Sequence, residues 1–120
     1  MHLRFLGKDK ASAGGDSPTL YATDQDSLIV QGWKVPGQEA QVTIPFNLFE
    51  HFDKAGLYGV TPHIGGPFTV GGDETCIVEG KPVTDVEVLA QMRIPAHESC
   101  VEITKATIAA RLREEADDHA

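Results

Sequence analysis

Five histidines and two cysteines are the side chains of this sequence that could best support catalysis or metal binding. The histidines are His2, His51, His63, His97 and His119. No two of them have the spacing of a metal-binding pair such as H-x-x-x-H. His97-Glu98 and His51-x-Asp53 each supply two ligands, which are too few for a metal site. We therefore predict no metal site and interpret the histidines as surface or turn residues.

The other catalytic and ligand-binding motifs are also missing from the sequence. No serine lies in G-x-S-x-G, and neither cysteine stands at the start of an expected helix. The glycine pairs Gly65-Gly66 and Gly71-Gly72 lack the context of a phosphate-binding loop. Asp24-x-Asp26 and Asp73-Glu74 lack the further oxygen ligands of a calcium loop. We predict no catalytic residue and no cofactor, which favours a protein that is not an enzyme.

Cys76 and Cys100 stand alone in apolar, β-like segments. Their setting favours two buried thiols. A disulfide between neighbouring strands and a metal pair are the alternatives, and the sequence does not decide between them.

Trp33 is the most informative aromatic residue. If it is buried, it anchors a sheet, and if it is exposed, it is a candidate interaction hot spot beside Tyr21 and Lys34. We favour burial. The residues that we consider for an interaction surface or a pocket are Trp33, Tyr21, Lys34, His63 and His97.

Two similar stretches organise the elements that must position these residues. Leu28–Val35 returns in altered form as Ile77–Val83, with Ile29-Val30-Gln31-Gly32 aligned to Ile77-Val78-Glu79-Gly80. The flanks correspond as well, 17–21 with 66–70 and 42–45 with 101–104. Similarity in a fixed order predicts a duplication, whereas coincidence between two hairpins is the alternative. We predict one α+β domain over 1–120. In it, two pseudo-repeats, about 17–57 and 66–115, each with mostly antiparallel strand-strand-strand-helix order, pack around a shared core.

The strand pattern follows runs of β-branched and aromatic residues between turns. We expect strands at Leu3–Leu6, Thr19–Ala22, Ser27–Val35, Ala40–Ile44, Phe68–Val70, Thr75–Val83 and Glu98–Ile103. Both faces of Ser27–Val35 carry apolar residues, so it should be central, and Gly32 predicts a bulge or the close approach of another segment. The glycines and serines between Lys8 and Ser17 predict a flexible loop at 8–17.

Three helices are expected. Phe46–Ala55 follows Pro45, has Leu48, Phe49 and Phe52 on one face, and ends at Gly56. A capping box at Thr84 predicts a short helix over Asp85–Met92 with Leu89 and Met92 inward. A last helix runs from Lys105 to about Glu115 with Ile108 and Leu112 as its apolar stripe, and we expect residues 116–120 to fray.

Composition limits the partners and the compartment. The 120 residues contain 10 Lys and Arg against 18 Asp and Glu, a net charge of −8 that opposes direct contact with nucleic acid or anionic membranes. No apolar run is long enough to span a membrane, and the N-terminus is too short and too soon polar for a signal peptide. We therefore expect a cytoplasmic protein.

Several segments together resemble a group of small actinobacterial proteins of unknown function. The likeness covers nearly the whole chain and is carried by residues 17–24, 30–35, 82–85, 89–92 and 94–102. Members of that group look like companions of helix-turn-helix regulators, and the strand and helix order is loosely similar to that of the BldB-like developmental proteins. The resemblance implies a protein-binding accessory in transcriptional control.

Three functions follow as hypotheses. The first is a non-enzymatic binding module that acts as a homodimer or binds a protein partner such as a basic DNA-binding regulator. The second is a small-molecule-binding protein or small enzyme with a pocket between the repeats, lined by Trp33, Tyr21, His63 or His97. The third is an assembly unit that pairs through exposed edge strands.

Overall fold

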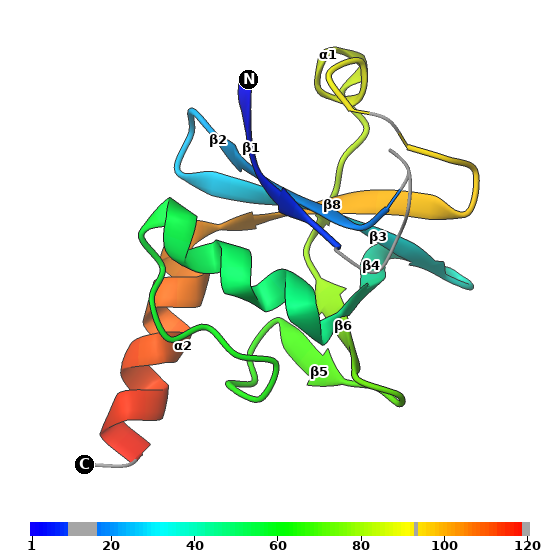
Figure 1. Cartoon of the computed structure of the whole chain (residues 1–120). Helices are drawn as coiled ribbons and strands as arrows, with labels where there is room; N and C mark the ends of the chain where they lie inside the picture. The colour runs from blue at the N-terminus through cyan, green and yellow to red at the C-terminus, as the bar shows by residue number, and fades with distance from the viewer. Residues whose placement is uncertain (10–16, 93, 119–120) are drawn as a thin grey trace.

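The described residues form a single sheet of eight strands with three helices around it, seen in the computed structural model of Figure 1. The structure describes residues 1–9, 17–92 and 94–118. The strands are β1 (Leu3–Lys8), β2 (Thr19–Thr23), β3 (Ser27–Val35), β4 (Gln38–Pro45), β5 (Phe68–Val70), β6 (Thr75–Glu79), β7 (Lys81–Pro82) and β8 (Glu98–Thr104). The helices are the 3₁₀ helix η1 (Phe46–Ala55), α1 (Val86–Leu89) and α2 (Lys105–Asp118). Because every strand pair among the described residues is antiparallel, the expected α+β class with a mostly antiparallel sheet is confirmed.

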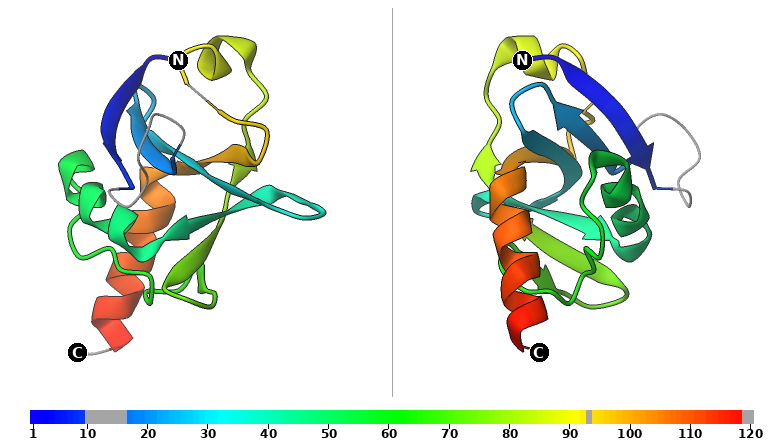
Figure 2. Two further views of the ribbon diagram at one scale, coloured as in Figure 1. Left: turned by 45° about the vertical axis from the view of Figure 1, so that its right-hand side comes forward. Right: turned by 90° about the vertical axis from the view of Figure 1, so that its left-hand side faces the viewer.

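Strand β3 is the centre of the sheet, as its two apolar faces predicted. β2 pairs with its first half and β4 with its second half along one edge, while β8 pairs along the other edge. β4 also pairs with β6, and β7 pairs with β8. Because β6 and β7 follow each other directly, these pairings close a ring through β3, β4, β6, β7 and β8. The β3–β4 hairpin extends from this ring as an arm (Figure 2).

The main core lies inside this ring and under η1 and α2. Alternate residues of β3, such as Leu28 and Val30, point into it. η1 adds Phe52 and α2 adds Ile108, and both side chains are almost fully buried. A second, smaller cluster covers the opposite face of β3 around Ile29, where the segment of α1 packs on the sheet.

Helix η1 begins after the extended Pro45 and ends at Gly56, whose left-handed φ of 79° fits the expected C-terminal cap. Phe46, Phe49 and Phe52 are spaced by three residues, which is the repeat of a 3₁₀ helix. This geometry brings all three rings to the same side. Phe49 and Phe52 are buried as expected, and Phe46 packs against the same core.

The second half differs from expectation in three places. The strand expected over Thr75–Val83 is broken at Gly80 into β6 and β7, because its two ends pair with different strands. The short helix covers only Val86–Leu89, and its cap is Asp85, whose carboxylate accepts the Glu87 N–H at 2.9 Å. Val88 is therefore the buried residue of this helix, and Leu89 is only partly buried. Met92, which lies beyond the end of the helix, is buried as expected.

The two ends of the chain also correct the sequence analysis in part. Lys8 belongs to β1 and not to a loop, and Ser17 is buried. Most of the flexible loop expected at 8–17 lies outside the described residues. Helix α2 continues through Asp118, past the point at which fraying was expected. None of the helices in the described ranges is long and apolar enough to cross a membrane.

Candidate functional site

The pairing of β3 with β8 gathers three of the five candidate residues at one end of the sheet. Trp33 lies directly opposite Glu98, and the Lys34 N–H donates to the His97 carbonyl oxygen at 3.1 Å. Gln31 lies two residues before Trp33 and therefore on the same face of β3. We call Gln31, Trp33, His97 and Glu98 the Glu98 cluster.

Glu98 is the unusual member of this cluster because its carboxylate is buried. Its side chain is 0% exposed, whereas that of His97 is 65% exposed. Gln31 Nε2 donates to Glu98 Oε1 at 3.0 Å, and His97 Nε2 lies 3.3 Å from Glu98 Oε2. A buried carboxylate is costly unless it is paired and hydrogen-bonded. The Glu98 carboxylate, a strong hydrogen-bond acceptor, therefore lies next to the exposed His97.

Trp33 is half-buried, so the burial that we expected is met only in part. Tyr21 lies further along the sheet in β2, opposite Ile29, and its ring packs edge-on against the exposed Phe5 at a centroid distance of 6.2 Å. Burial raises the pKa of the Tyr21 hydroxyl, and the Cys100 thiol raises it further.

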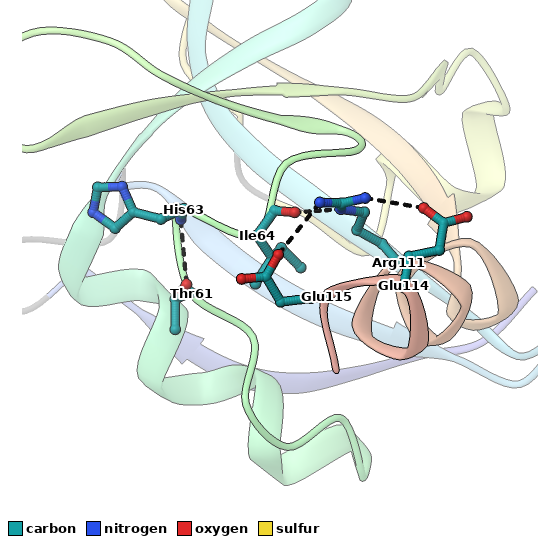
Figure 3. A network of polar contacts seen from close by, with 6 residues as sticks. All are labelled: Thr61, His63, Ile64, Arg111, Glu114 and Glu115. Carbon is teal, nitrogen blue, oxygen red and sulfur yellow. Dashed lines mark hydrogen bonds and ion pairs between the residues drawn. The ribbon is translucent and has the colours of Figure 1, made fainter. Parts of the chain in front are cut away.

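His63 is separated from the Glu98 cluster in the fold. It is exposed in the connector between η1 and β5, where its ring lies 5.7 Å from that of Phe46. The backbone N–H of His63 donates to the Thr61 hydroxyl, as Figure 3 shows. The sequence grouped His63 with residues that the fold does not bring near it.

Hydrogen bonds of Arg111 join the connector beside His63 to α2. Arg111 donates from Nε to the Ile64 carbonyl and from its two terminal nitrogens to Glu114 at 3.0 Å and to Glu115 at 3.3 Å (Figure 3). A pocket of about 430 Å³ lies here. Because the guanidinium is already engaged by three acceptors, this pocket offers no free cation from Arg111.

One histidine was misjudged from the sequence. His51 is buried, and Lys54 Nζ lies 3.0 Å from its Nδ1 and donates to the Leu6 carbonyl at 3.0 Å. A Cβ added at Gly7 would lie 2.2 Å from the His51 ring, so this glycine allows β1 to pack on η1. The position of His51 three residues after the buried Leu48, in a 3₁₀ repeat, is the signal that could have revealed it.

The outer edge of β1 is partly covered by side chains. The Gln91 side chain accepts the Leu3 N–H at 3.0 Å and donates to the Met1 carbonyl at 2.9 Å. Lys54 Nζ donates to the Leu6 carbonyl oxygen further along the same strand. Covering an edge in this way limits strand addition, so assembly through β1, one form of the third hypothesis, receives no support here.

A second concave site, the hairpin groove, lies between the β3–β4 arm and β7. Its volume is about 910 Å³, and it is lined by residues 34–41, 82–84, 99 and 100. Of the five candidate residues only Lys34 lines this groove. Its walls come from both of the proposed repeats.

Cys76 and Cys100 are free and buried, in agreement with the favoured sequence interpretation. Burial raises the pKa of each thiol from 9.0 to about 11. Among the residues described, no three His, Cys, Asp or Glu side chains come together as a possible metal site.

The thiols give a prediction about reactivity and alkaline stability. They should react with 5,5′-dithiobis(2-nitrobenzoate) only when the protein unfolds, because the thiolate is the reactive form. The raised pKa of both thiols means that the folded state binds these protons more tightly. The associated stability is complete below pH 9 and declines towards pH 11, by about 1.4 kcal/mol per thiol at pH 10. Rapid labelling of the folded chain at pH 8, or equal alkaline loss in a Cys76→Ala/Cys100→Ala variant, would contradict this.

Comparison of the chain with protein-family models, with curated proteins and with solved structures found no match. The fold itself defines the class of protein, which is an α+β domain built on a mostly antiparallel sheet.

Proposed function

We propose that this chain is a non-enzymatic binding module for a basic protein, and that it serves in the cytoplasm as an accessory of a DNA-binding regulator of transcription. The observation that carries the proposal is the Glu98 cluster, where a half-buried tryptophan and an exposed histidine surround a buried carboxylate. Tryptophan is enriched in protein-interaction hot spots. The net charge of −8 would attract a basic partner over long distances.

An internal duplication is the second part of this proposal, and the strand registers support it. In both hairpins the aligned valines Val30 and Val78 pair with an apolar residue of the preceding strand, Leu20 and Phe68. Leu20 lies one residue away from the position that the alignment of 17–21 with 66–70 gives to Phe68, so this register repeats only to within one residue. The cross-pairing between the halves also repeats. Val42 pairs with Val78 and Ile44 with Cys76, whereas Val101 pairs with Val30 and Ile103 with Leu28. In this cross-pairing the same aligned residues thus meet in both halves.

Backbone details support the duplication independently. Asp26 and Glu74, which occupy matching turns, have left-handed φ angles of 56° and 60°. Their carbonyl oxygens accept the first N–H of the helix in the opposite half, from Lys105 and from Phe46, each at 2.9 Å. Two halves joined in this way share one core.

Capture followed by reconstitution tests the proposed function. The immobilised chain should retain a basic protein from an actinobacterial lysate, and the purified partner should bind the purified chain at least about tenfold more weakly when salt rises from roughly 50 to 300 mM. Trp33→Ala should weaken this binding about tenfold or more, whereas the exposed Tyr58→Ala should leave it unchanged. A chain that retains no basic protein and stays monomeric in light scattering at high concentration would exclude both the partner and the homodimer.

A small-molecule-binding protein is the second candidate, favoured by the hairpin groove between the two halves. Its lining includes Lys34, Gln38, Gln41 and Thr84, residues that carry a cation or hydrogen-bonding groups. Ligand pockets are commonly found where two units meet. A ligand here would protect the amides of residues 38–41 from hydrogen exchange, a pattern that binding at the Glu98 cluster would not produce.

A further inference from the structure

We propose that the Glu98 carboxylate receives an arginine side chain of the basic partner. This inference rests on the proposed function and names the contact that would give it specificity. Two properties of the cluster carry it, the incomplete pairing of a buried charge and the groups that surround it.

The buried charge is incompletely compensated in the free protein. In the described part of the chain, Glu98 Oε2 makes no hydrogen bond, and the only ion pair of this carboxylate is with His97. A permanently charged group in the same place would compensate Glu98 more fully.

The surrounding groups match a guanidinium better than an ammonium. A guanidinium is planar and binds a carboxylate through two parallel hydrogen bonds. Trp33 stands directly opposite Glu98 on the neighbouring strand, at the separation of a cross-strand pair. Its indole ring can stack on a flat cation, and Gln31 Nε2 holds the carboxylate in place through a 3.0 Å hydrogen bond to Oε1.

His97 provides the route from the surface. Its side chain is 65% exposed while its Nε2 lies 3.3 Å from the buried Oε2, and in this proposal the imidazole turns away when the arginine enters. An incoming arginine would take the place of the imidazole over the carboxylate. His97 is then a competitor of the partner and not one of its ligands.

The other half of the molecule supplies a matched comparison. In the proposed duplication, Glu39 in the β3–β4 arm is the counterpart of Glu98, because Val42 aligns with Val101. Glu39 is exposed, and its neighbours in the other half differ, with Lys81 in place of Trp33. The two carboxylates therefore have the same charge and equivalent places in the sequence, but only Glu98 is buried.

The test uses the single tryptophan as its reporter. The full chain is titrated with the peptide Ac-Gly-Arg-Val-Arg-Gly-NH₂ and with versions that carry lysine or citrulline in place of arginine, and binding is followed by Trp33 fluorescence and by calorimetry. The arginine peptide should bind about tenfold more tightly than the lysine peptide, and the citrulline peptide should not bind. Glu98→Gln should weaken arginine binding about 30-fold or more, and Glu39→Gln by less than about twofold.

A second variant keeps the proposal falsifiable if Glu98→Gln does not fold. His97→Ala should strengthen arginine binding by about threefold or more, since the competitor is removed, whereas a purely structural histidine would give no gain. Equal binding by the wild type, Glu98→Gln and His97→Ala would overturn the arginine site while leaving a basic partner possible. Absence of binding to every basic peptide, together with no captured partner, would reject the proposed function as well.

Discussion

Replacing Gly32 or Gly80 with alanine should destabilise the protein severely, by about 3 kcal/mol or more in each case. A Cβ at Gly32 would lie 2.5 Å from the Thr43 carbonyl oxygen, and one at Gly80 would lie 2.6 Å from the Glu102 carbonyl oxygen. Both obstacles are backbone atoms of neighbouring strands. They cannot move away without loss of the strand pairing that closes the ring.

Urea denaturation followed by circular dichroism measures this effect for each variant. Gly72→Ala is the matched control, because a Cβ there meets nothing within 4 Å, and it should change the free energy of unfolding by less than about 0.5 kcal/mol. If the two halves are copies, Gly32→Ala and Gly80→Ala should have similar effects. If either variant unfolds at the same urea concentration as the wild type, the strands do not approach each other as closely as described.

These glycines also show what the sequence could reveal. Gly32 in the middle of an apolar strand predicted a bulge or a close approach, and the structure has the close approach. Local patterns likewise located the two hairpins and the cap at Gly56. These features depend on residues near one another in the chain, so their physical causes are visible in the sequence.

The contents of the candidate site depend instead on contacts between distant segments. Glu98 is buried because β8 pairs with β3. Its hydrogen-bond partner Gln31 lies 67 residues earlier in the chain. Nothing in its neighbours along the chain distinguishes it from the exposed Glu39. The break at Gly80 is hidden for the same reason, since it reflects the different partners of β6 and β7. Trp33, Lys34 and His97 could be listed as candidates, but their meeting point could not be predicted.

Phe52→Ala should produce the other large loss of stability, about 3–5 kcal/mol. Phe52 is 1% exposed, and its ring centroid lies 5.3 Å from that of Phe49 and 5.8 Å from that of Phe68. Truncation would leave a cavity at the point where η1 meets β5, in addition to the lost aromatic contacts. Tyr58→Ala, which removes a ring that is 73% exposed, should cost less than about 0.5 kcal/mol.

A double-mutant cycle with Phe68→Ala turns this prediction into a test of the shared core. Phe52 belongs to the first proposed repeat and Phe68 to the second, and their rings meet at an interplanar angle of 84°. If the halves fold around one interior, the two substitutions should not be additive. The loss of unfolding free energy in the double variant should be smaller than the sum of the two single losses by at least about 0.5 kcal/mol, because the contact between the two rings can be removed only once. Unfolding should also stay a single transition in all variants. Additive losses with two separate transitions would mean that the halves have independent cores, and the interlocked arrangement of strands would then contribute little to stability.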